Sequence, residues 1–201
     1  MIAVIATDAQ TKLRVPTAEV IATVNSHFSG QEYSNDYLDF SILVPGGWTF
    51  YEAAQNSAVI ERNLQFAENS PDAQVKVSAA NTQILFQAIP PKYGGQDKQA
   101  ILSAGIEKLT ARMTAEQYAA VQKKLVLGPA DVRLTKDIYT ASYGLASFSA
   151  FDVEVPRPTG SYRQRYLMTV RRGVALFFVA TFFDDRQAAI VDASLKSIKF
   201  K

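Results

Sequence analysis

The sequence predicts an α+β protein, an α/β/α sandwich in which helices flank a central, largely antiparallel sheet. In the second half of the chain strand patterns follow one another directly, unlike the strict alternation of a doubly wound fold. The segment 174–183 (VALFFVATFF) is apolar on both faces, so it belongs in the middle of a sheet covered on both sides. Two helical stripes with capping residues supply covering helices.

The composition limits the classes of protein to which the chain can belong. The 201 residues are 48% apolar, with 12 Phe and 9 Tyr, which is enough for a substantial core. The formal net charge of +2 gives no reason to expect a nucleic-acid partner. The chain has no cysteine, which excludes disulfides, thiolate metal sites and cysteine nucleophiles. No apolar run reaches the roughly 20 residues that span a bilayer.

The first part of the chain predicts a tail, a helix and a strand. Residues 1–16 lack a sustained period and read as an N-terminal tail, and 17–201 as a single domain. Thr17 can cap a short helix that ends near Gly30. Residues 37–44 alternate as a half-buried strand, whose inner face is Leu38, Phe40, Ile42 and Val44.

The next segment predicts a turn, a long helix and two strands. Pro45-Gly46-Gly47 must stop the strand, and Trp48 follows at the corner. Helical spacing favours one long helix between Thr49 and about Asn81, interrupted or ended near Pro71. Strands are then expected at 82–90 and 100–109, separated by a glycine-containing loop at 92–98.

The remainder predicts a helix, four strands and a last helix. Thr114 and Gln117 form a capping box for a helix that ends at Gly128-Pro129. Strands are expected at 133–139, 145–155, 162–170 and 174–183, the last two joined by the tight turn Arg171-Arg172-Gly173. Asp184 can cap the final helix, whose inner stripe is Val191, Leu195 and Ile198.

Two segments resemble the PsbP-like superfamily, which includes the extrinsic protein of photosystem II and a eukaryotic Ran-binding regulator. The first is 33–48 (YSNDYLDFSILVPGGW), a Tyr-x-Asn-x-Tyr strand that ends in Pro-x-x-Trp. The second, 160–200, runs from a Gln-x-Tyr strand through a basic-Gly turn to an aromatic strand and a helix closing in Ile-Lys-Phe. The chain departs from the pattern at Gly173-Val174, where an aromatic residue more usually follows the turn glycine.

This resemblance implies the α/β/α sandwich and a non-enzymatic accessory or protein-binding module of the bacterial cell envelope. It implies an extracytoplasmic location, periplasmic or secreted, with the leader absent from this chain; the sequence is also compatible with the cytoplasm. It implies no catalytic residues, no metal and no cofactor. The alternative hypothesis is a carrier of a small apolar ligand, with a pocket between sheet and helices, and an enzyme assembled from distant residues comes third.

Four arginines form the strongest polar feature. Arg163, Arg165 and Arg171 share one parity of the last hairpin, and Arg172 lies in its turn. If this face is exposed, the four guanidinium groups would bind a partner rich in carboxylates or phosphates. The competing and favoured interpretation is that they pair across strands with acids such as Asp152 and Glu154. These two carboxylates, which could also do acid–base work, are better explained as a solvated strand face.

Trp48 and Tyr93 are the candidate pocket or interface residues. Trp48 could anchor an interface or gate a pocket together with the 92–98 loop that carries Tyr93, but a lid over its own core is the favoured interpretation. The one histidine, His27, has no cysteine or second histidine to complete a metal site, and is expected to be a structural or solvent-facing residue of the first helix.

Overall fold

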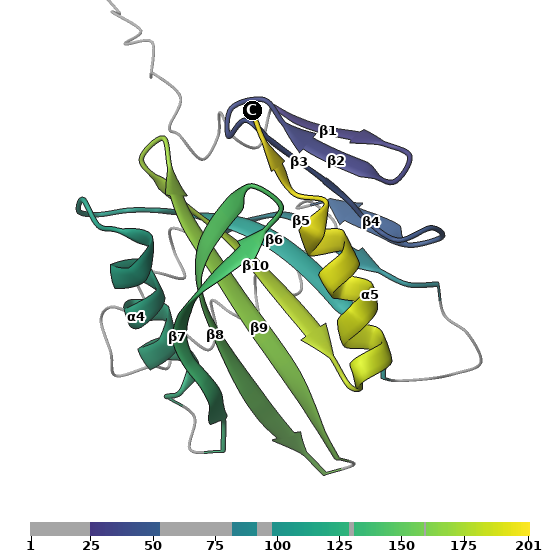
Figure 1. Ribbon diagram of the computed structural model, residues 1–201, viewed down its shortest axis with the longest axis vertical. Helices are drawn as coiled ribbons and strands as arrows, with labels where there is room; N and C mark the ends of the chain where they lie inside the picture. The colour runs from purple at the N-terminus through teal and green to yellow at the C-terminus, as the bar shows by residue number, and fades with distance from the viewer. Residues whose placement is uncertain (1–24, 53–81, 92–97, 129–130, 159) are drawn as a thin grey trace, which may run out of the picture.

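The computed structural model describes residues 25–52, 82–91, 98–128, 131–158 and 160–201 of the chain. Within these residues two antiparallel sheets lie beside each other, with two helices packed on them (Figure 1). The predictions of a tail over 1–16, of a helix start at Thr17, of the long helix over 53–81 and of a loop at 92–97 lie outside the described residues.

The large sheet has seven strands in the order β4-β5-β6-β10-β9-β8-β7, and every neighbouring pair is antiparallel. Its central strand is β10, the segment that is apolar on both faces, so the predicted position is confirmed. The strands are β4 (Thr49–Glu52), β5 (Thr82–Ile89), β6 (Ile101–Lys108), β7 (Arg133–Tyr143), β8 (Ala146–Arg157), β9 (Gly160–Arg171) and β10 (Val174–Phe182).

The small sheet has four strands in the order β1-β2-β3-β11. They are β1 (Ser26–Ser29), β2 (Glu32–Asn35), β3 (Phe40–Leu43) and β11 (Lys199–Phe200). Leu38, Phe40, Ile42 and Val44 are all buried, as predicted for the inner face of the 37–44 segment. The predicted strand is wrong over 37–39, which form a turn with Asp39 at φ +53°, so β3 begins at Phe40. The end of the chain returns to β3, where Phe200 lies opposite Phe40.

Two predicted helices are wrong where the structure describes them. Residues 26–29 belong to strand β1 rather than to the first helix, because Phe28 packs its ring on Tyr33 and Phe50 from neighbouring strands, each at 5.1 Å. Residues 49–52 are strand β4, paired with β5, rather than the start of a long helix. In both places a sheet contact outweighs a weak local preference.

The two described helices begin where the sequence predicts. Helix α4 (Ala115–Val126) has the complete capping box, in which Gln117 N donates to Thr114 Oγ1 at 3.2 Å and Thr114 N donates to Gln117 Oε1 at 2.8 Å. Helix α5 (Asp185–Lys196) starts at Asp184, whose carboxylate accepts from Gln187 N at 2.8 Å. Each cap satisfies backbone donors that a helix start leaves unpaired.

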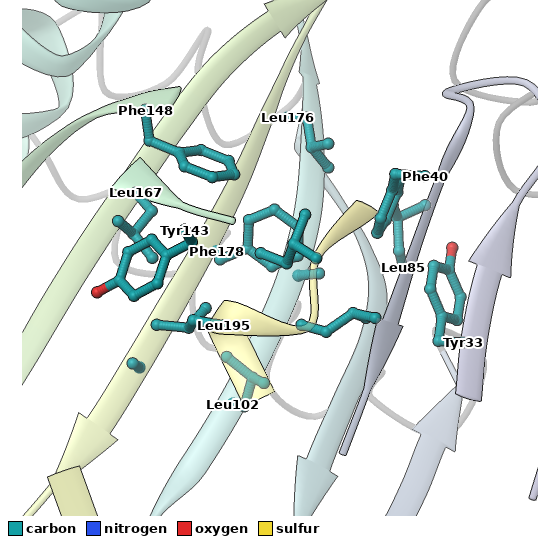
Figure 2. Packing of buried hydrophobic residues seen from close by; sticks show 14 of the residues in the cluster. Tyr33, Phe40, Leu85, Leu102, Tyr143, Phe148, Leu167, Leu176, Phe178 and Leu195 are labelled. Atoms are coloured by element: carbon teal, nitrogen blue, oxygen red, sulfur yellow. The ribbon is translucent and has the colours of Figure 1, made fainter. Parts of the chain in front are cut away.

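The core lies on both faces of the large sheet. One face packs against α5 and the small sheet, with the rings of Phe40, Phe148 and Phe178 in edge contact (Figure 2). On the other face Tyr118 and Ala119 of α4 lie with Ala175 and Met168. The fold is therefore α+β, mostly antiparallel and dominated by sheet; with two described helices, full α/β/α layering stays a prediction.

The Tyr-x-Asn pattern is a structural feature of the small sheet. The Tyr33 hydroxyl and Ser26 Oγ share a hydrogen bond of 2.7 Å, and Asn35 Nδ2 donates to both oxygens, at 3.3 and 3.2 Å. The amide oxygen of Asn35 accepts from Leu38 N at 2.9 Å, which shapes the turn into β3. Because each buried polar group finds a partner, the pattern stabilises the fold instead of offering a free binding group.

Candidate functional site

The candidate site is a face of the large sheet that we call the charged face: Asp152 and Glu154 of β8, and Arg163 and Arg165 of β9. Strand register places Asp152 opposite Arg165 and Glu154 opposite Arg163. These side chains continue the alternation that buries Phe148 and Ala150 farther along β8. The face turns polar toward the β8–β9 turn, and α5 borders it beside β10 (Figure 1).

Arg165 is the centre of a half-buried network. Its Nε lies 3.3 Å from Asp152 Oδ1, and its Nη1 donates to Asp192 Oδ1 of α5 at 2.6 Å. The same Nη1 donates to the Tyr143 hydroxyl at 3.0 Å, and the Tyr139 hydroxyl donates to Asp152 at 2.9 Å. The arginine is 20% exposed, so this network ties three strands to α5 rather than presenting a free guanidinium group.

Burial and charge shift the acidities in this network. Burial, with the nearby Asp152 carboxylate, raises the pKa of Tyr139, and burial also raises the pKa of Tyr143. Burial opposes the charge of Arg165, but the Asp152 carboxylate together with Tyr143 and Tyr139 outweighs it and holds the arginine pKa above its ordinary value. The network therefore keeps neutral tyrosines, a cation and two carboxylates in fixed positions near neutral pH.

The outer members of the charged face are more exposed. Arg163 Nη2 donates to Asp185 at 2.7 Å, with the two side chains 41% and 94% exposed. Arg133 of β7 donates to Glu154 at 3.1 Å, and Ser161 also donates to Glu154. Exposed ion pairs of this kind contribute only about 0 to 1 kcal/mol to folding, so Arg163 can exchange its partner at little cost.

The other two arginines lie at the opposite end of β9. Arg171 Nε donates to the carbonyl oxygen of Leu38 at 3.0 Å, and its guanidinium lies 4.3 Å from the ring centre of Phe200. Arg172 donates to the Asp39 carboxylate and lies over the Tyr37 ring. These contacts bring the two PsbP-like sequence segments together and dock the small sheet on the β9–β10 turn.

The four predicted arginines therefore do not form one compact group. Arg163 and Arg171 are eight residues apart on one strand, which is roughly 26 Å at the ordinary rise of a strand. The expected pairing with acids across strands is present for Arg165 and Asp152. Binding of a partner by the four arginines stays a prediction.

Of the two candidate pocket or interface residues, only Trp48 lies within the described part of the chain. Trp48 is half-buried and packs against the main core. Its backbone N–H donates to the carbonyl oxygen of Pro45 at 3.1 Å within the turn. The packing of Trp48 against the core fits the lid interpretation, while a role at an interface stays a prediction. Tyr93 lies outside the described residues.

The remaining candidates are peripheral. His27 is an exposed residue of β1, not of a helix, and its Nε2 lies 3.0 Å from Asp36 across the first hairpin. Within the described ranges no group of three or more histidine, aspartate or glutamate side chains could hold a metal ion. Among the same residues no helix is long and apolar enough to cross a membrane.

Sequence reasoning missed Tyr139, Tyr143 and Asp192. The two tyrosines are four residues apart on β7 and so share a face, but the predicted strand ended at Tyr139 and left Tyr143 in the expected connection. Asp192 lies on α5 and meets Arg165 only because the helix crosses β10 toward β9. No local sequence pattern predicts that contact.

The five tyrosines with raised pKa values predict loss of stability in alkali. Burial raises the pKa of Tyr33 to about 12, while the unfolded chain ionises near 10. The folded state then retains protons that the unfolded state loses, so stability falls as pH rises from about 10 to about 12. As an upper limit, the raised pKa of Tyr33 alone should lower the free energy of unfolding by roughly 3 kcal/mol over this pH range. The other four are Tyr118, Tyr139, Tyr143 and Tyr166.

Urea unfolding at several alkaline pH values, followed by the ultraviolet absorbance of tyrosinate, checks this prediction. The Tyr33→Phe variant should be less stable near neutral pH, because it loses the hydrogen bond to Ser26, but its stability should fall less steeply in alkali. A free energy of unfolding that stays constant between about pH 10 and 12 would contradict the assignment.

Comparison with known proteins identifies the fold. No family model and no curated protein matches the sequence. The fold is that of PsbP-like proteins. The solution structure of cyanobacterial PsbP (CyanoP) from Synechocystis sp. PCC 6803 superimposes with a TM-score of 0.52, at 16% identity, covering 85% of this chain and 92% of that one.

Two further structures are similar. LpqN of Mycobacterium tuberculosis, described as involved in cell envelope biogenesis, has a TM-score of 0.50 at 11% identity and covers 81% of this chain and 83% of its own. A protein of Bacteroides thetaiotaomicron VPI-5482 has a TM-score of 0.49 at 11% identity; this chain matches 49% of its length, about half. The TM-scores of the CyanoP and LpqN structures show a shared fold, which confirms the PsbP-like fold that the two sequence segments predict.

Proposed function

We propose that the protein is a non-enzymatic accessory module of the bacterial cell envelope, located outside the cytoplasm, that binds a protein partner through the charged face. Two kinds of support favour this function. The fold is shared with PsbP-like proteins, one of which is described as involved in cell envelope biogenesis. Charged residues of both signs, Arg163 and Glu154 among them, also lie opposite one another near the β8–β9 turn.

The exposed ion pairs of the charged face carry the proposal. Arg133, Arg163 and Asp185 contribute little to folding at their degree of exposure. Strand register nevertheless sets Arg133 of β7 and Arg163 of β9 on either side of Glu154. Charges of alternating sign on a sheet provide specificity and association rate to a protein interface. The half-buried Arg165 network beneath them keeps the backbone of this surface rigid.

The carrier hypothesis lacks a supporting observation. Between the sheets the described aromatic rings meet one another directly, with centroid separations of 5.7 Å for Phe40 with Phe178 and 5.9 Å for Phe148 with Phe178. The half-buried Trp48 packs on this cluster. Close-packed rings of this kind fill the space that an apolar ligand would need.

Affinity co-purification from envelope and cytosolic fractions of the native cell tests the proposal. The wild type should recover a specific protein from the envelope fraction. Arg163→Glu should lower the recovery on the order of tenfold, because it places like charges in the interface while leaving the Arg165 network intact. Arg112→Glu, which reverses an exposed arginine outside the charged face, is the matched control and should behave like the wild type.

Two results would overturn the proposal. One is the absence of any specific partner from the envelope fraction, and the other is equal recovery by Arg163→Glu and the wild type. Substrate turnover that disappears with a single acidic or basic residue would replace the module by an enzyme.

A further inference from the structure

A fully exposed leucine marks the end of the large sheet opposite the charged face. Leu145 stands at the tip of the β7–β8 turn with its side chain entirely in water. The preceding Gly144 has φ +59° in this two-residue turn, a conformation that glycine adopts without strain. Single exposed leucines are common on protein surfaces, so the neighbours of Leu145 decide whether it has a role.

The neighbours of Leu145 are the last residues of α5 and a second exposed leucine. A Cβ at Gly144 would lie 3.6 Å from the carbonyl oxygen of Lys196 and 3.7 Å from that of Ile198, so the turn rests on the end of α5. On another side of the same segment, Leu43 N donates to Ser197 Oγ at 2.7 Å, and Leu43 is 47% exposed. Two accessible apolar side chains therefore flank residues 196–198.

Three lysines lie on residues 196–201, which run from the end of α5 along β3. Lys196, Lys199 and Lys201 are exposed, and none of them forms an ion pair with an acid in the described part of the chain. Lys199 lies opposite Ser41 on β3, and Lys201 N donates to the carbonyl oxygen of Asp39 at 2.8 Å. The side chain of Asp39 is already paired with Arg172.

We propose that this leucine–lysine edge, formed by Leu43, Leu145, Lys196, Lys199 and Lys201, binds the surface of an anionic phospholipid bilayer. The ammonium groups would contact lipid phosphates while Leu145 enters the boundary between headgroups and acyl chains. Basic residues attract anionic lipid surfaces electrostatically, and apolar side chains beside them add binding by burial.

The composition of the edge favours a membrane over a protein partner. Protein interfaces are depleted of lysine and enriched in aromatic residues and arginine, whereas the cations without acidic partners here are all lysines. Long lysine side chains can extend to headgroup phosphates while their stems cover apolar surface. A leucine that projects from a tight turn can enter a lipid boundary without a matching pocket.

Vesicle co-sedimentation with the full chain tests the inference. The wild type should sediment with vesicles of phosphatidylcholine mixed with phosphatidylglycerol, should remain in solution with phosphatidylcholine alone, and should be released by added salt. Lys196→Glu/Lys199→Glu should weaken binding on the order of tenfold or more. Leu145→Ser should weaken binding several-fold while salt sensitivity persists.

Matched controls separate this edge from the rest of the surface. Leu134→Ser changes an exposed leucine of β7 away from the edge, and Arg163→Glu changes the charged face; both should sediment like the wild type. Because Lys196 lies in the last turn of α5, where a cation is favourable, Lys199→Glu/Lys201→Glu serves if the first double variant does not fold.

Several outcomes would overturn the inference. They are equal sedimentation with both kinds of vesicle, equal sedimentation of wild type and lysine variants, and complete competition by soluble glycerol phosphate, which would indicate a site for the free headgroup. The partner recovered by co-purification tests a different surface, so either proposal can fail without the other.

Discussion

Replacing Phe178 by alanine should destabilise the protein by about 3 to 5 kcal/mol, the largest effect that we expect from a single substitution. Phe178 is buried at the centre of β10, with its ring in edge contact with Phe40 of the small sheet and with Phe148 of β8 (Figure 2). Alanine would remove these contacts and leave a cavity between the two sheets. Urea unfolding measures the loss, and the melting temperature should fall by roughly 6 to 20 °C.

Two further variants calibrate this result. Phe178→Leu should lose less, because it fills most of the volume, and it keeps the test valid if the alanine variant does not fold. Leu145→Ala changes a fully exposed side chain and should stay within about 0.5 kcal/mol of the wild type. A loss below about 1 kcal/mol for Phe178→Ala would show that the two sheets do not depend on this ring.

Replacing Arg165 by methionine should cost about 2 to 3 kcal/mol, less than the full penalty for a buried pair because water still reaches the site. The substitution keeps an apolar stem but leaves Asp152 and Asp192, both less than half exposed, without their common cation. It also removes the donor to the Tyr143 hydroxyl. Chemical unfolding of the purified variant gives the free energy directly.

Arg163→Met is the matched control for this prediction, since it lies on the same face of the same strand. Its partner Asp185 is almost fully exposed, so the loss should be about 0 to 1 kcal/mol. Adding Asp192→Asn to Arg165→Met should restore part of the lost stability, because one carboxylate no longer needs a cation. Equal losses for the two arginines would contradict the network as described.

The predictions from sequence succeeded where a signal is local. Alternation identified the buried face of the segment around Phe40, the Thr114 capping box placed the start of α4, and the Arg171-Arg172-Gly173 turn located the last hairpin. Each of these depends on residues only a few positions apart. The predicted helix through Phe28 failed because its apolar spacing suits a helix, while ring contacts to other strands hold it in a sheet.

In the candidate site, too, local features were predicted from the sequence and long-range contacts were not. The parity of β9 correctly placed Arg163 and Arg165 on one face, and pairing with Asp152 was an expected alternative. The sequence could not reveal that Arg165 is half-buried against Asp192, nor that Arg172 docks the small sheet through Asp39. The partners in these two contacts are separated by many residues and meet only after the sheets and α5 have packed.

By itself, the sequence determined the class of fold, most strand positions, both described helix starts and the parity of the charged residues. Turn chemistry, capping and side-chain periodicity act over a few residues and are therefore visible in a linear pattern. Tertiary structure alone decided which charges are buried, which stay exposed and which leucines and lysines lie together. Exposure and pairing depend on strand register and on the packing of α5, and these contacts join residues that are distant along the chain.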